Sequence, residues 1–253
     1  MYIDNHCHIF SEYYKDIDRV IKEANDNKVN VLVLSGCSKK DILEGLEIIK
    51  KHKNVYMTIG FHPDEVDNTN DEDISWLENL IKTNDKIVGI GEIGLDYHWV
   101  KDNKDKQIEL FEKQLQLAEK LNYPIVIHTR DATDDTIKIL KKYQLKGIIH
   151  CFSGSIETAR EYLKLGYNIG IGGVITFKNT NLKETIKEIP IEKITLETDS
   201  PYLAPTPHRG EDNSPKYIPL IAEEIAKQKE LSTETVEKIT SSTSISLFDL
   251  HIQ

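Results

Sequence analysis

The sequence has few cysteines, no long apolar run and no basic segment followed by an apolar one at its start, and each absence argues against a class of protein. Its 253 residues include three cysteines (Cys7, Cys37 and Cys151) without C-x-x-C spacing, which predicts small buried side chains and neither disulfides nor a thiolate metal site. The longest apolar runs, such as Val31 to Leu34, fall far short of the roughly 20 residues that a membrane-spanning helix needs. The chain opens without a basic segment followed by an apolar one, so we expect a cytoplasmic protein that does not enter a membrane.

Basic residues are also in the minority. The chain has 32 Lys and Arg against 42 Asp and Glu, a formal net charge of −10. Such a chain lacks the extended basic surface that holds nucleic acid through many phosphate contacts. Arg130 and Arg209, two of only four arginines, fall in predicted loops beside candidate site residues. Any nucleic acid must therefore bind through a few contacts at one small site.

Short apolar segments alternate with amphipathic helical patterns along the whole chain. This alternation is typical of βαβ units around a parallel sheet. The predicted strands are 1–8, 29–35, 55–60, 86–92, 124–129, 147–151, 167–172 and 193–199, and the clearest helices are 41–50, 73–81, 104–121 and 156–165. Two further helices are expected from about residue 215. Eight strands without a linker predict one (β/α)₈ TIM barrel over residues 1–253, rather than an open doubly wound sheet.

Ionisable residues gather where six of these strands end. In a barrel the carboxyl ends of the strands share one face, which carries the active site of characterised barrel enzymes. The residues at those ends are His6 and His8, His62, Glu92, His128, His150, and Glu197 and Asp199.

This set predicts a metal centre. His6 and His8 are two residues apart on a strand, so both imidazoles can face the interior while Cys7 faces the helices. Histidine and carboxylate ligands suit Zn²⁺, Mn²⁺ or Mg²⁺. Four histidines and two carboxylates exceed the needs of one four-coordinate ion, so we expect two divalent ions bridged by Glu92. One ion is then held by His6, His8, Glu92 and Asp199, and the other by Glu92, His128 and His150.

Two such ions can clamp the oxygens of a phosphoryl displacement and lower the pKa of a bound water. We expect Asp199 to act as general base as well as ligand. Glu197 is expected to support the ligands from behind rather than to bind metal. The run Tyr97, His98 and Trp99 after the fourth strand has two open interpretations, stacking on a base and packing within the loop.

Six segments of the chain resemble the TatD family of metal-dependent deoxyribonucleases, a branch of the amidohydrolase-like barrels. They are Asp4-Asn5-His6-Cys7-His8, Gly60-Phe61-His62-Pro63, Gly89 to Tyr97, His128-Thr129-Arg130-Asp131-Ala132, His150-Cys151-Phe152-Ser153-Gly154 and Glu197 to Pro205. One segment departs from the family pattern, because Glu211 and Asp212 stand where basic residues usually follow Arg209.

The resemblance implies an activity and a site. It implies that His6, His8, Glu92, His128, His150 and Asp199 are metal ligands and that Glu92 and Asp199 are catalytic. It implies that His62, Arg130, Ser153 and Arg209 lie near the substrate phosphate. The expected function is hydrolysis of DNA phosphodiester bonds, as an exonuclease acting on single-stranded or frayed ends, by a chain that we expect to be a monomer.

Two other functions remain open at this point. Related barrels hydrolyse amides, lactones or phosphotriesters, but commonly bridge their ions with a carboxylated lysine. Here the fourth strand ends in Glu92 and its lysine, Lys86, stands at the far end. An ester on tRNA is also a possible substrate. A non-catalytic barrel is the other alternative, although none of the six expected ligands is missing.

Overall fold

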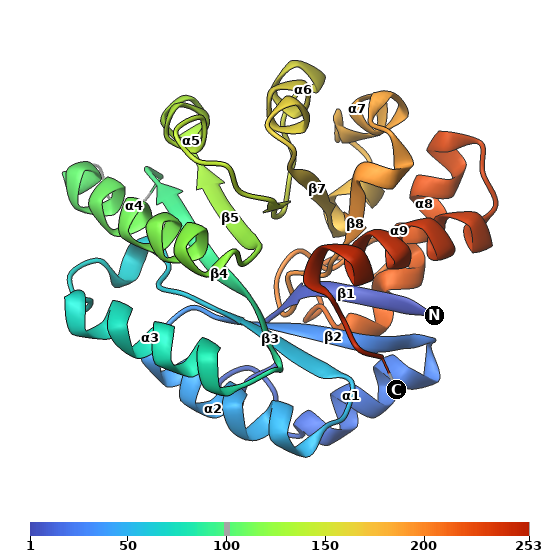
Figure 1. The fold of residues 1–253 in the computed structure, drawn as a ribbon. Helices are drawn as coiled ribbons and strands as arrows, with labels where there is room; N and C mark the ends of the chain where they lie inside the picture. The colour runs from blue at the N-terminus through green and yellow to red at the C-terminus, as the bar shows by residue number, and fades with distance from the viewer. Residues whose placement is uncertain (99–101, 253) are drawn as a thin grey trace.

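The protein is a barrel of parallel strands ringed by helices, seen in a computed structural model that describes residues 1–98 and 102–252 (Figure 1). Within these residues eight strands follow one another around one sheet in chain order. They are β1 Tyr2–Cys7, β2 Val29–Gly36, β3 Val55–Ile59, β4 Ile87–Asp96, β5 Ile125–Arg130, β6 Gly147–Ile149, β7 Asn168–Ile171 and β8 Ile194–Leu196. The predicted (β/α)₈ fold is therefore confirmed.

Helices alternate with the strands and cover the outside of the barrel. They are α1 Ile17–Asp26, α2 Lys39–Lys51, α3 Asp71–Thr83, α4 Lys104–Leu121, α5 Thr133–Leu140, α6 Ile156–Lys164, α7 Leu182–Glu188, α8 Ile218–Lys229 and α9 Thr233–Phe248, with short 3₁₀ turns η1 Pro63–Glu65, η2 Gly173–Thr176, η3 Ile191–Lys193 and η4 Pro215–Tyr217. Their ends follow local rules, as at α3, where Asn70 and Asp73 form a reciprocal capping box. In the described part of the chain, no helix is both long enough and apolar enough to cross a bilayer.

The barrel closes between β1 and the segment after β8. The amide of His8 donates to the carbonyl of Ser200 at 2.8 Å, and the amide of Asp199 donates to the carbonyl of His6 at 2.9 Å. Cys7 and Ser200 form a parallel bridge. These bonds bring the first and last site segments side by side, although they are almost 200 residues apart in the chain.

The strands are buried on both faces, which explains their nearly continuous apolar sequences. The inner cluster holds residues such as Val31, Val88 and Val126, and Leu247 and Phe248 at the end of α9 pack against it. The larger cluster lies between the strands and the surrounding helices and includes Cys7, whose side chain is buried there. The C-terminal part of α9 therefore plugs the amino end of the barrel and leaves the carboxyl end for the site.

Strand boundaries were the least accurate part of the prediction. The strand predicted to end at Glu92 continues to Asp96, so Glu92 lies inside β4. The strands predicted to reach residues 151 and 199 end at Ile149 and Leu196. The backbone turns into the left-handed region at Cys151 (φ 48°) and Asp199 (φ 55°), which no strand accommodates. Of the predicted aromatic run, Trp99 lies outside the described residues.

Candidate metal centre

The six predicted ligands come together at the carboxyl end of the barrel. His6 and His8 lie at the end of β1, and Glu92 and His128 lie within β4 and β5. His150 and Asp199 lie on the turns that follow β6 and β8. Apart from the side chains of His8, Asp199 and His128, which are 12%, 15% and 17% exposed, the side chains of the group are almost completely buried.

The first half of the centre is formed by His6, His8 and Asp199 on one side of Glu92. The Nε2 atoms of His6 and His8 are 3.1 Å apart. They lie 3.3 and 3.9 Å from Glu92 Oε2, and 3.7 and 3.4 Å from Asp199 Oδ1. Four donor atoms thus point at one small volume.

The second half of the centre is formed by His128 and His150 around the other carboxylate oxygen of Glu92. Oε1 lies 2.7 Å from Nδ1 of His128 and 3.4 Å from Nε2 of His150. The ligand atoms of Glu92, His128 and His150 lie within 4.8 Å of one another, as do those of His6, His8 and Glu92. One carboxylate therefore contributes an oxygen to each of two histidine pairs.

The electrostatics of this cluster fit a cation. Burial acts to raise the pKa of Glu92, but His150, His6 and His128 outweigh it and hold that pKa well below its usual value. Burial acts to lower the pKa of His128 and His150, whereas nearby carboxylates raise them to about 9 and about 10. Without a cation, the raised pKa values of His128 and His150 favour protons on these two histidines, which compensate the buried carboxylates. A divalent ion replaces those protons directly, and the donor set of imidazole nitrogen and carboxylate oxygen is the one that such ions bind.

Glu197 supports the centre from behind, as predicted for its position. Its side chain is fully buried, its Oε1 accepts from the amide of Cys151, and it lies 3.2 Å from Nδ1 of His150. Gly170 makes room for it, because a Cβ there would lie 2.3 Å from Glu197 Oε2. Among the described residues, Glu197 belongs to none of the groups whose ligand atoms converge.

The four predicted phosphate-binding residues differ in their positions relative to the six ligands. Nε2 of His62 lies 4.0 Å from Glu92 Oε1, at the edge of the centre. Arg130 ends β5, and its charge acts against the rise in pKa that burial causes at Cys151. Ser153 is exposed on the turn after His150.

Arg209 makes its contacts with residues other than the six ligands. Its guanidinium lies 3.8 Å above the ring of Phe177 and donates to the carbonyl of Ala204 at 3.0 Å. Within residues 1–98 and 102–252, no hydrogen bond or ion pair joins Arg209 to the six ligands. The arginine positions the loop after β8 at the rim.

Sequence reasoning missed several neighbours of the centre. Asp96 Oδ2 lies 3.0 Å from Nε2 of His128, and Asp96, His62 and His128 form a further group with converging ligand atoms. Asp96 was overlooked because β4 was expected to end four residues earlier. Cys37, interpreted as a small apolar side chain, is partly buried and lies 3.5 Å from Glu92 Oε2.

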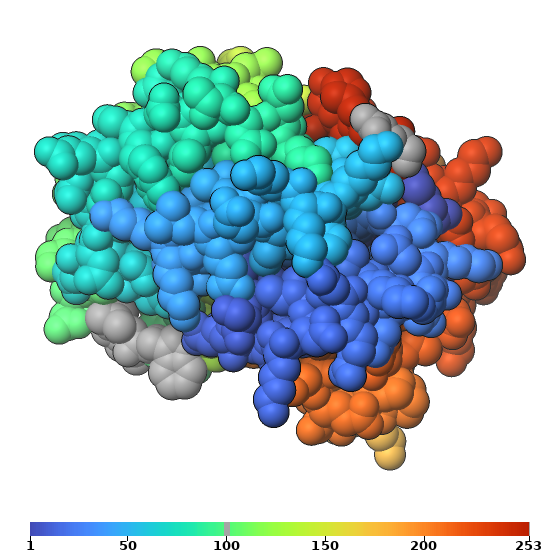
Figure 2. All heavy atoms as spheres, turned by 90° about the horizontal axis from the view of Figure 1, so that it is seen from below, coloured from blue at the N-terminus to red at the C-terminus, as the bar shows by residue number. Residues whose placement is uncertain are grey.

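Two exposed tyrosines beside the centre were also missed. The rings of Tyr13 and Tyr202 lie edge to face with centroids 5.9 Å apart, and their hydroxyls are 3.0 Å apart. The ring of Tyr202 lies 6.2 Å from that of His8. Figure 2 shows blue atoms of the N-terminal part of the chain next to orange atoms from its C-terminal part. The only available signal was the position of Tyr202 three residues after Asp199.

Comparison with known proteins agrees with this geometry. The family model described as TatD related DNase matches residues 3–249. The chain belongs to the TatD family. Among TatD relatives, it is 41% identical over 256 residues to the metal-dependent hydrolase YabD of Bacillus subtilis (strain 168), covering 99% of this chain and 100% of YabD.

Other TatD relatives extend the comparison. The chain is 41% identical over 241 residues to the metal-dependent hydrolase MJ1582 of Methanocaldococcus jannaschii, covering 94% of this chain and 93% of that protein. The crystal structure of YJJV, a TatD homologue from Escherichia coli k12, superposes with a TM-score of 0.93 at 25% identity, covering 99% and 98% of the two chains. The chain is therefore a member of a family of metal-dependent hydrolases with the barrel seen here.

Proposed function

We propose that this TatD family member is a deoxyribonuclease that hydrolyses DNA phosphodiester bonds with two divalent ions, as an exonuclease on single-stranded or frayed ends. The observation that carries the proposal is the division of the Glu92 carboxylate between the His6 and His8 pair and the His128 and His150 pair. A shared carboxylate between two sets of nitrogen ligands suits a pair of ions, and paired ions suit phosphoryl transfer. The family description as a TatD related DNase supports the same substrate class.

The residues that would hold the ions are His6, His8, Glu92, His128, His150 and Asp199. Mg²⁺, Mn²⁺ or Zn²⁺ bound there would supply Lewis acidity that polarises the phosphodiester and makes a water molecule more acidic. Glu92 is buried and its pKa is lowered, so the carboxylate is ionised. Its two oxygens would then hold one ion beside each histidine pair. His62 and Asp96 lie beside the second half and limit how the substrate phosphate enters it.

Asp199 is the residue placed to accept the proton of the attacking water. Burial acts to raise the pKa of Asp199, but His150, His8 and His6 lower it below its usual value, so the carboxylate is ionised. Its side chain is 15% exposed, which lets water reach it. Asp199 takes a proton from the water as the water oxygen bonds to phosphorus and the bond to the leaving oxygen breaks, and this proton then passes to the leaving oxygen.

The substrate is held locally, in keeping with the acidic chain. We expect His62, Arg130 and Ser153 to contact the phosphate next to the ligands, while Arg209 holds the rim loop on Phe177. Tyr13 and Tyr202 are exposed by 39% and 49% and offer an aromatic surface beside His8. A base can stack there without sequence preference, because every base has a π-face. An unpaired end fits this arrangement better than a continuous duplex does, and a single chain supplies the whole site.

Digestion of a short end-labelled single-stranded oligonucleotide tests the proposal. Metal-stripped protein is supplied in turn with Mg²⁺, Mn²⁺ or Zn²⁺, and products are resolved by length. We expect stepwise shortening with at least one ion and none with chelator. Glu92→Gln should be inactive, whereas Glu72→Gln, on the exposed face of α3, should match the unchanged protein. An intact oligonucleotide with every ion, alongside hydrolysis of a lactone or phosphotriester, would contradict the nuclease assignment.

A further inference from the structure

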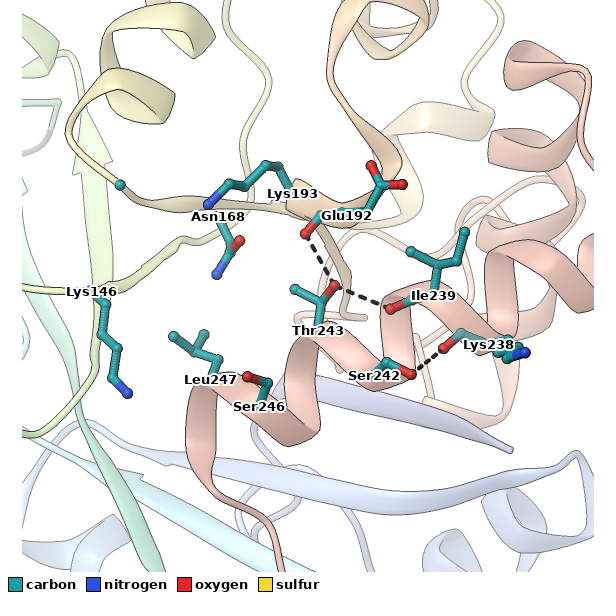
Figure 3. A pocket seen from close by; sticks show the side chains of 11 residues that line it. Lys146, Asn168, Glu192, Lys193, Lys238, Ile239, Ser242, Thr243, Ser246 and Leu247 are labelled. Atoms are coloured by element: carbon teal, nitrogen blue, oxygen red, sulfur yellow. Dashed lines mark hydrogen bonds between the residues drawn. The ribbon is translucent and has the colours of Figure 1, made fainter.

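Asp4 of β1 is a buried acidic residue that has no part in the proposed mechanism. It is 0% exposed, and within the described residues no lysine, arginine or histidine forms an ion pair with it. It also does not line the cavity of about 530 Å³ at the amino end of the barrel, which lies between the starts of several strands and α9 (Figure 3). Burying a carboxylate is costly unless its oxygens are well bonded. With no exposed surface, Asp4 can act only through its neighbours.

The backbone of β1 is irregular next to Asp4. The stretch from Asp4 to Cys7 pairs with the shorter stretch from Leu32 to Leu34 on β2, so β1 contains one extra residue. Such a β-bulge bends the strand, and bulges beside active sites commonly redirect a side chain. The stretch includes His6, whose amide donates to Asp4 Oδ1 at 3.3 Å. The carboxylate thus bonds the backbone inside the bulge.

The same carboxylate spans the gap where the barrel closes. Within the described sheet no ladder of backbone pairs joins β1 to β8, and the isolated bridge between Cys7 and Ser200 is the one pair across this gap. Asp4 Oδ1 accepts from the amide of Thr198 at 2.9 Å, and Oδ2 accepts from the hydroxyl of Thr198 at 2.5 Å. A side chain therefore supplies contacts that a backbone ladder supplies between the other neighbouring strands.

Both residues bound by Asp4 are connected to candidate ligands of the first half of the centre. His6 is one of these ligands, and Thr198 directly precedes Asp199, which is another. The amide of Asp199 donates to the carbonyl of His6 at 2.9 Å, so these contacts form a closed ring through Asp4. Nε2 of His6 and Oδ1 of Asp199 lie 3.7 Å apart across the same gap. Their separation thus depends on the bonds of one buried carboxylate.

We propose that Asp4 is a positioning residue of the metal centre, which holds His6 and Asp199 at the separation that the first ion requires. With metal–ligand bonds of about 2.1 Å, two ligand atoms of a tetrahedral ion lie about 3.4 Å apart. The two ligand atoms are already close to this separation, so little movement is needed when an ion binds. This inference rests on the two-ion centre proposed above and adds a residue that is not a ligand.

The effect of Asp4 should be confined to the first ion. Within the described residues its carboxylate forms no hydrogen bond with Glu92, His128 or His150. A residue needed only for stability would instead weaken both halves of the centre as the fold loosens. Selective loss of one ion is therefore the result that separates positioning from a purely structural role.

Two substitutions of Asp4 grade the loss of its hydrogen bonds. Asp4→Ala removes every acceptor, and we expect it to lower the affinity for the first ion by about 10–100-fold. Asp4→Asn should lower it less, because the carboxamide oxygen can still accept from both amides. Its nitrogen can donate to the hydroxyl of Thr198, which has Ser200 Oγ as a further partner at 3.0 Å. Partial rescue by asparagine is thus expected.

Competition of the full chain with a metal-sensitive chelator, with Zn²⁺ as the probe, measures the affinity for each ion. Burial raises the pKa of Asp4 to about 7, although the bonds from Thr198 and His6 act against it. Measurements are therefore made above this pH, where the carboxylate is ionised. Asp199→Ala and His128→Ala identify the first and second ion by removing one ligand of each. Asp4→Ala should weaken the ion that Asp199→Ala weakens.

Double variants test whether Asp4 and Asp199 act together. Asp4→Ala should add little to Asp199→Ala, whereas it should keep its full effect in His128→Ala, because coupled residues are not additive. The matched control is Asp73→Ala, which removes another buried carboxylate, one that binds the amide of Asn70 and pairs with Lys39 on α2. It should lower the melting temperature without changing the affinity for either ion.

Several outcomes would overturn the role of Asp4. They are unchanged affinity in Asp4→Ala and Asp4→Asn, equal weakening of both ions, and the same weakening in Asp73→Ala. Circular dichroism checks the fold, and if Asp4→Ala does not fold, Asp4→Asn and Thr198→Val carry the same test with smaller losses. A protein that binds one ion only would contradict the two-ion mechanism, while the effect of Asp4→Ala on that ion would still decide the role of Asp4. The nuclease activity is not part of the readout.

Discussion

Glu197 Oε1 lies 3.2 Å from Nδ1 of His150, on the edge of the ring opposite to the one that faces Glu92. A carboxylate behind a ligating histidine fixes the orientation of the ring and raises its basicity. Glu197 is fully buried, and its neighbours include His150, the amide of Cys151 and Gly170. We therefore expect metal binding in the second half of the centre to depend on a residue that is not itself a ligand.

Replacing this carboxylate should weaken metal binding without removing a ligand. We expect Glu197→Gln to lower the affinity for divalent ions by about 10–100-fold, because the amide keeps the size of the side chain but loses its charge. Competition with a metal-sensitive chelator measures the affinity, and Glu47→Gln on the exposed face of α2 is the control. Unchanged affinity in the Glu197 variant would show that the contact is structural only.

Asp199→Asn should abolish hydrolysis while keeping the fold. Asp199 is in the left-handed region, at φ 55°, which asparagine tolerates nearly as well as aspartate does. Loss of a general base typically slows a reaction by about 10²–10⁴-fold. Single-turnover rates and circular dichroism separate the two effects, with Asp212→Asn on the exposed rim as the control. Asp199→Ala should also be inactive and still folded, and appreciable turnover by either variant would exclude the role of base.

Removal of metal should lower the melting temperature. The ligands keep carboxylates and imidazoles crowded in a buried volume, so a bound cation stabilises the folded state alone. An ion at 100 times its Kd adds about 2.7 kcal/mol per site. For a chain of this size that amounts to roughly 5–10 °C per site. Scans with chelator and after metal is added back measure the shift, which should be smaller in Glu92→Gln; identical scans would contradict metal binding.

The tyrosine pair should affect substrate binding rather than chemistry. Tyr202→Ala removes an aromatic ring worth about 1–3 kcal/mol per stacked base, so we expect KM for a single-stranded oligonucleotide to rise about 5-fold or more with kcat nearly unchanged. Tyr202→Phe keeps the ring and should retain most of the affinity. Leu43→Ala, another exposed apolar side chain, serves as the control. A fall in kcat alone would place Tyr202 in the chemical step instead.

Arg209 should likewise act through binding. Arg209→Ala removes the contacts with Phe177 and the carbonyl of Ala204 that hold the rim loop, so we expect weaker substrate binding and a smaller change in the rate of cleavage. Arg209→Lys should not restore binding, since an ammonium cannot stack as a planar guanidinium does. Arg160→Ala, on the outer face of α6, is the control. A change confined to the maximal rate would contradict this prediction.

Features set by neighbouring residues were predictable from the sequence. The alternation of apolar segments and helical patterns led to the (β/α)₈ barrel, and the spacing of His6 and His8 placed both imidazoles on one face of a strand. The expectation that strand ends share one face then collected the remaining candidate ligands. These inferences hold because side-chain direction along a strand repeats locally every two residues.

Tertiary structure alone decided how these groups meet. The turn at Asp199, the extension of β4 to Asp96 and the packing of Arg209 on Phe177 depend on contacts between segments far apart in the chain. The division of Glu92 between two histidine pairs depends on how β1, β4, β5 and the turn after β6 pack around the barrel. No local pattern encodes these relationships, because strand register and loop paths are set by packing across the whole barrel. The sequence thus determined which candidate ligands are present, and the tertiary structure determined which of their atoms lie close together.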